Sequence, residues 1–223
     1  MDVIKRAIEH LNPGQVTVTT VDQPLFAIAK IIQWNWPESY GEDKFVVLLG
    51  GLYIEMATLA ILGYLFDGSG RTNVLTKAGI ATPGTADSFL KGAHVKQTRH
   101  AHQVTSSALS IMLRTAYDAY CLDTSEPLPF DDWCVKQVEA SPQFHYWYMV
   151  MHLECLMLVF ARSIREGNFP LYITGLRALA PWFFALEYTY YSRWVPVHIR
   201  DMTTLHERLP DVAKEFDRGS FVV

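Results

Sequence analysis

The chain has 223 residues, of which 50% are hydrophobic, 13% aromatic and only 19% charged. This composition supports a hydrophobic core and excludes intrinsic disorder, because disordered chains are rich in charge and poor in aromatic residues. The formal net charge of −4 excludes a uniformly basic surface, so any contact with nucleic acid would need a local patch.

The first part of the chain alternates between helix and strand signals. A short helix is expected over Asp2–Leu11, followed by a strand over Val16–Val21, where valine and threonine alternate. Pro24 opens a second helix that runs to about Gln33, and the apolar segment Phe45–Leu49 predicts a second strand. Because two strands flank one helix, we expect them to be adjacent and parallel.

The apolar segment Phe45–Phe66 is long enough to span a bilayer. It contains Glu55, however, and Gly50-Gly51 divides it into a β-like part and a part rich in helix formers. We interpret it as a buried strand, a turn and a buried helix. A second apolar run, Tyr146–Ala161, contains Glu154 and is interpreted as a core helix. No membrane contact is therefore expected.

The rest of the chain carries mainly helical signals. The main expected helices are His94–Tyr120, Pro142–Arg165, Leu171–Tyr191 with a kink at Pro181, a helix from Pro196 to Leu209, and Asp211–Asp217. Phe221–Val223 is typical of the opening of a further strand. The predicted class is α+β and helix-rich, with a small β/α core portion in residues 1–70 and a helical region in residues 71–223. So few strands suggest part of a larger fold.

The cysteines favour a reducing compartment. Cys121, Cys134 and Cys155 are far apart and form neither a CxxC pair nor an even set, which argues against a disulfide framework. We therefore expect an intracellular protein, with the nucleus as a candidate location.

Two carboxylates are candidates for catalysis and metal binding. Asp22 comes directly after the first strand, at the edge where α/β folds place their sites, and Glu55 follows the second strand. Carboxylates at this edge can hold Mg²⁺ for phosphodiester chemistry. Two structural alternatives stay open: Asp22 caps the helix beginning near Pro24, and Glu55 is a buried carboxylate with a polar partner.

One local basic patch lies between residues 91 and 102. Lys91, Lys96 and Arg99 could contact nucleic-acid phosphates, or could simply form a solvated helix start. His100 and His102 are two residues apart, so on a helix they point in nearly opposite directions and cannot share a metal. The aromatic residues between 182 and 194 are more typical of a core or a protein interface than of a base-stacking platform.

Several segments together resemble a known group of proteins. The segments are Asp22–Ala27, Gly50–Met56, Ala81–Thr85, Arg99–His102, Arg165–Phe169, Tyr190–Trp194 and Phe216–Val223. Together they resemble uncharacterised mobile-element-associated proteins of animal genomes, which are similar to transposases with an RNase H-like core interrupted by helices. The resemblance extends over nearly the whole chain.

The resemblance implies a transposase-derived protein or fragment with an incomplete RNase H-like core. Asp22 matches the first-strand carboxylate, but Gly50-Gly51 stands where related sequences have an acidic residue. The group's chains continue past Val223 toward a third carboxylate. We therefore expect no catalysis and no cofactor, and whether the chain is an enzyme stays open. One alternative is a Mg²⁺-dependent nuclease or transposase using Asp22 and Glu55. The other is a non-enzymatic module that binds a protein partner.

Overall fold

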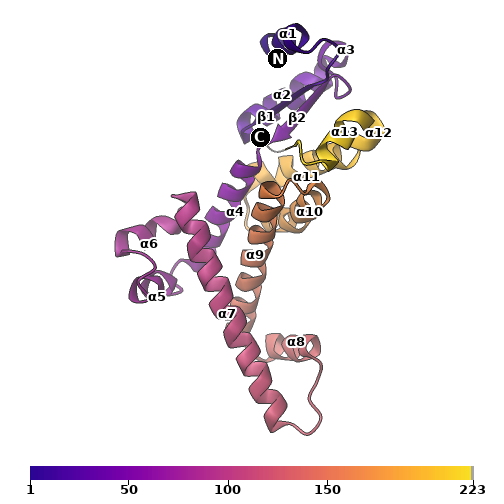
Figure 1. The fold of residues 1–223 in the computed structure, drawn as a ribbon. Coiled ribbons are helices and arrows are strands. Elements are labelled where there is room, and N and C mark those ends of the chain that lie inside the picture. The colour runs from indigo at the N-terminus through magenta and orange to yellow at the C-terminus, as the bar shows by residue number, and fades with distance from the viewer. Residues whose placement is uncertain (222–223) are drawn as a thin grey trace. The chain divides into compact units, whose positions relative to one another are not determined.

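A computed structural model describes residues 1–221 as a helix-rich α+β fold (Figure 1). These residues form two compact units. Unit 1 comprises Met1–Thr58 and Val159–Val223, and unit 2 comprises Leu59–Leu158. The predicted helix-rich α+β class is confirmed. The division predicted near residue 70 stays a prediction; unit 1 takes its residues from both ends of the chain, because a helix near the C-terminus packs against one near the N-terminus.

Unit 1 contains a two-stranded parallel sheet. After α1 (Asp2–Leu11), β1 (Thr17–Val21) pairs with β2 (Phe45–Leu49), and Val21 lies opposite Leu49, so both strands end at the same edge. Helix α2 (Gln23–Asn35) and the short α3 (Pro37–Tyr40) connect the strands. Every residue of β2 is buried, whereas β1 is partly exposed, as their apolar and alternating sequences require. The predicted adjacent parallel pair is confirmed.

The C-terminal helices complete unit 1. They are α10 (Phe169–Ala185), α11 (Thr189–Thr203), α12 (Leu205–Arg208) and α13 (Pro210–Asp217). Helix α2 packs against α11, and α10 packs against α11 and α13. At their centre Phe169 contacts Phe216 edge-on, with ring centroids 5.3 Å apart. The single helix predicted over residues 171–191 is wrong. The chain turns at Glu187, whose φ of 56° is left-handed, and Pro196 lies inside α11 rather than at its start.

Unit 2 is helical throughout. It contains the second part of α4 (Gly51–Phe66), then α5 (Arg71–Lys77), α6 (Pro83–Phe89), α7 (Val95–Asp123) and α8 (Phe130–Ala140), and the first part of α9 (Pro142–Arg165) (Figure 1). Gly63 permits a close approach, because a Cβ there would lie 1.9 Å from the carbonyl oxygen of Leu90. The predicted division of Phe45–Phe66 into strand, glycine pair and helix is confirmed.

Within residues 1–221, α9 alone is long and apolar enough to cross a membrane. Its most apolar window is 44% buried, and a core helix has the same length and composition. One such helix is weak evidence for a membrane protein. The strand expected over Phe221–Val223 involves Val222 and Val223, which lie outside the described residues. Phe221 itself is in a turn and packs on Phe169.

Candidate functional sites

Asp22 lies where the sequence predicts it, directly after β1 at the carboxyl edge of the sheet. Its Oδ1 accepts a hydrogen bond from the backbone N–H of Leu25 at 3.1 Å, which makes it the N-cap of α2. Such a cap satisfies one of the free N–H groups of the first helical turn. The capping alternative is thus confirmed, and a catalytic role stays a prediction.

Glu55 also belongs to unit 1, in the second turn of α4, and is only 3% exposed. Among residues 1–221, no three His, Cys, Asp or Glu side chains are grouped so that they could hold a metal ion. Mg²⁺ requires several oxygen ligands, and a two-metal site requires more than one carboxylate. Beyond this result, the Asp22–Glu55 metal site stays a prediction.

The predicted basic patch belongs to unit 2. Lys91 follows α6 and Lys96 lies in the first turn of α7, and both are exposed, whereas Arg99 is partly buried. His100 is exposed and His102 fully buried, which agrees with the prediction that they point in different directions. Lys91 and Lys96 are therefore accessible to a phosphate backbone.

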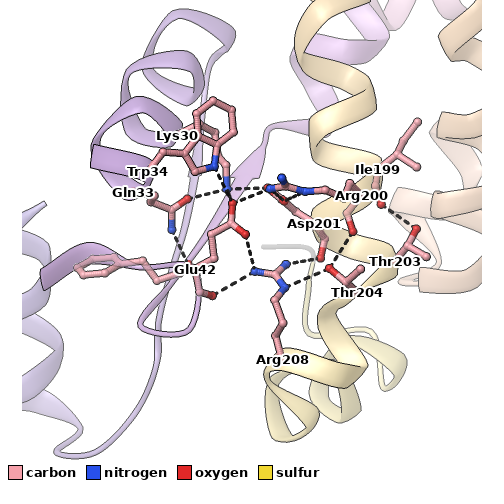
Figure 2. Close-up of polar contacts among 11 residues, drawn as sticks. Lys30, Gln33, Trp34, Glu42, Ile199, Arg200, Asp201, Thr203, Thr204 and Arg208 are labelled. Atoms are coloured by element: carbon pink, nitrogen blue, oxygen red, sulfur yellow. Dashed lines mark hydrogen bonds and ion pairs between the residues drawn. The ribbon is translucent and has the colours of Figure 1, made fainter. Parts of the chain in front are cut away.

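The sequence does not reveal a cluster of ion pairs in unit 1, formed by Lys30, Glu42, Arg200, Asp201 and Arg208 (Figure 2). Lys30 is at its centre, with a side chain that is 1% exposed. Its Nζ contacts the carboxylate of Glu42, lies 2.8 Å from Oδ2 of Asp201, and donates to Oε1 of Gln33 at 2.8 Å. This ion-pair cluster joins α2, the segment before β2, α11 and α12.

Two arginines complete the ion-pair cluster. Arg200 Nη2 lies 2.6 Å from Oε1 of Glu42, and Arg208 Nη1 lies 3.3 Å from its Oε2. Arg208 also donates to the carbonyl oxygen of Asp201 at 2.7 Å. Burial alone would raise the pKa of Glu42, but the hydrogen bond and charge of Lys30 outweigh burial and lower it. Because each charge has a partner, the cluster is suited to holding these elements together rather than to proton transfer.

Unit 2 contains a second buried polar group that the sequence does not reveal, formed by Arg71, His102 and Glu154. His102 Nδ1 and Glu154 Oε1 are 2.8 Å apart, and Arg71 Nη2 lies 3.9 Å from the same oxygen. Burial raises the pKa of Glu154 to about 8, although the Arg71 charge opposes this change. Burial and the Arg71 charge lower the pKa of His102 well below 6.5. At neutral pH a neutral histidine and a largely protonated glutamic acid therefore face a charged arginine.

The ion-pair cluster and the buried polar group of unit 2 share one sequence signal, a charged residue inside an apolar helix. Lys30 and Glu154 each lie within a helix whose neighbouring residues are apolar, and both side chains are almost fully buried. A charged residue in such a position requires a partner. The partners are distant along the chain, so the sequence indicates that they exist without identifying them.

A family model for a domain of unknown function (DUF8702) matches residues 2–126 and 129–223. These matches cover nearly the whole chain, so the chain belongs to this family. No curated protein and no solved structure matches it.

Proposed function

We propose that this chain is a transposase-derived protein without catalytic activity, built on an incomplete RNase H-like core. The observation that carries the proposal is the shared edge of the parallel strands. Asp22 follows β1 there, while Gly50-Gly51 follows β2, in register with it. The β1–α2–β2 crossover thus presents one carboxylate at the position where a nuclease of this kind needs at least two.

The local role of Asp22 supports the absence of catalysis. One of its carboxylate oxygens already accepts the N-cap hydrogen bond of α2. Glu55 is almost fully buried on α4, where a hydrated Mg²⁺ ion and a nucleic-acid phosphate have little access. The other carboxylate oxygen of Asp22 would be a single ligand, and one ligand does not make a stable metal site.

The test is a nuclease assay on the purified chain, with single- and double-stranded DNA in Mg²⁺ or Mn²⁺. We expect no cleavage. The matched variant is Asp22→Asn, because asparagine caps a helix about as well as aspartate and so changes the metal ligand without changing the fold. Cleavage that disappears in Asp22→Asn would support the nuclease alternative. Cleavage that persists in Asp22→Asn would place an active site elsewhere in the chain and would also contradict the proposal.

DNA is the proposed partner of the basic patch, because Lys91 and Lys96 are both exposed near the start of α7. Fluorescence anisotropy with a short duplex would measure binding across a salt series. Affinity should fall steeply with salt, and replacing both lysines with glutamine should reduce the slope by about 0.9 per lost phosphate contact. Lys77→Gln, an exposed lysine on α5, is the control. Salt-insensitive binding, or no effect of the double variant, would remove DNA as the partner.

A further inference from the structure

Unit 2 contains a cavity of about 700 Å³ between α5, α7, and the start of α9. Most of its lining is aliphatic or aromatic, including Val74, Leu109, Met112, Leu113, Phe144 and Trp147. Cavities of this size and character are typical of small-molecule sites. The lining alone would suit an uncharged apolar ligand.

Arg71 changes this expectation, because it is the one charged residue in the lining. Its side chain is 2% exposed, and its Nε donates to Oγ1 of Thr105 at 3.1 Å. Its two terminal nitrogens, Nη1 and Nη2, are buried and have no hydrogen-bond partner among the described residues. Leaving buried donors of a charged group without acceptors is unfavourable.

Neither Phe66 nor Glu154 supplies the hydrogen bonds that Nη1 and Nη2 of Arg71 lack. The guanidinium lies over the ring of Phe66, 4.3 Å from its centroid, and this ring offers no oxygen or nitrogen acceptor to Nη1 and Nη2. Glu154 is 3.9 Å away and its Oε1 is bonded to His102 instead. Because burial raises the pKa of Glu154 to about 8, this carboxyl group provides little negative charge at neutral pH. The buried arginine therefore lacks a full counter-charge.

We propose that this cavity binds an amphipathic carboxylate of the fatty-acid type, with its carboxylate on the terminal nitrogens of Arg71 and its chain along the apolar lining. A planar guanidinium pairs with a carboxylate through two parallel hydrogen bonds. Both nitrogens are covered, so binding requires the guanidinium to turn toward the cavity that Arg71 already lines. A ligand with many phosphates or hydroxyls is disfavoured, because the lining offers few other polar groups.

Decanoate is the probe, added to the full chain below the concentration at which it forms micelles. Binding is measured by calorimetry and by the change in tryptophan fluorescence, to which Trp147 in the cavity lining contributes. Decanol, with the same chain and no charge, should bind at least about tenfold more weakly, since it lacks the charged hydrogen bonds. Equal affinities for the two ligands would overturn the proposal. Binding of an amphipathic peptide without binding of decanoate would also overturn it, and would make the cavity a protein-docking groove.

Two variants test the charge of Arg71 and the volume of the cavity separately. Arg71→Met should remove the preference for decanoate over decanol, whereas Lys77→Met, an equal charge change at an exposed position of α5, should leave it intact. Ala108→Trp fills the cavity from an exposed position of α7 and does not alter Arg71, so the fold should tolerate it. It should weaken decanoate and decanol alike, by about tenfold or more. Unchanged decanoate affinity in either Arg71→Met or Ala108→Trp would refute the site.

Discussion

Replacing Lys30 with methionine removes a buried ammonium group from the centre of the ion-pair cluster in unit 1 (Figure 2). Methionine has nearly the same length, so the change removes charge and leaves packing largely unaltered. The carboxylates of Glu42 and Asp201, which are 23% and 5% exposed, would lose a shared cation. A carboxylate that is buried without its cation is strongly destabilising.

The expected loss of stability in Lys30→Met follows from how deeply its ion pairs are buried. Removing one partner of a buried ion pair costs about 3–5 kcal/mol. Because Glu42 is partly exposed and both carboxylates keep an arginine partner, we expect the lower end, about 3 kcal/mol. Arg200→Met is the comparison, since the Arg200 side chain is 49% exposed and its contacts resemble surface pairs. Its expected cost is about 0–1 kcal/mol.

The assay is urea unfolding followed by tryptophan fluorescence and circular dichroism, with coincident transitions as the condition for a two-state analysis. Trp34 reports directly on this region, because Lys30 Nζ lies 5.8 Å from its ring centroid. A double-mutant cycle with Asp201→Asn should give a coupling of about 1–3 kcal/mol. A Lys30→Met variant whose free energy of unfolding is within about 0.5 kcal/mol of that of the parent protein would show that Lys30 does not stabilise unit 1.

Three further predictions concern other elements. Asp22→Ala should lower the free energy of unfolding, measured in urea, by about 1 kcal/mol, because the α2 cap is lost. Asp22→Asn keeps the cap and should not lower it. Equal losses of stability in the two variants would contradict the capping role. Gly63→Ala should lower the melting temperature, because its Cβ would lie 1.9 Å from a backbone oxygen, whereas Gly84→Ala has nothing within 4 Å and should be tolerated. Since the pKa of Glu154 is about 8 in the folded chain, this group binds a proton that the unfolded chain releases near 4.5. Its contribution to the free energy of unfolding should therefore decrease as pH rises from 4.5 to 8. The melting temperature of Glu154→Gln, measured across this pH range, should lack this decrease. The same pH dependence in Glu154→Gln and the parent protein would show that Glu154 does not have the raised pKa.

Local sequence signals were sufficient for the β/α part of unit 1. The alternating valines and threonines, the apolar run Phe45–Leu49 and the Gly50-Gly51 pair act over a few residues, so their effect can be read without knowing distant contacts. The parallel pairing then follows from the handedness and length of a strand–helix–strand connection. The capping role of Asp22 has the same local origin, because its partner is three residues away.

The tertiary structure alone decided which charged residues are buried and which groups they meet. Lys30 and Glu154 lie in apolar helices, but the groups they contact at 2.8 Å, Asp201 and His102, come from other elements far along the chain. The turn at Glu187 is another example, because nothing in its residue type demands a left-handed conformation. Ion pairing in a low-dielectric interior depends on distances between elements. Those distances are set by packing, so a local reading of the sequence predicts that a buried charge needs a partner, and only the fold determines which partner it has.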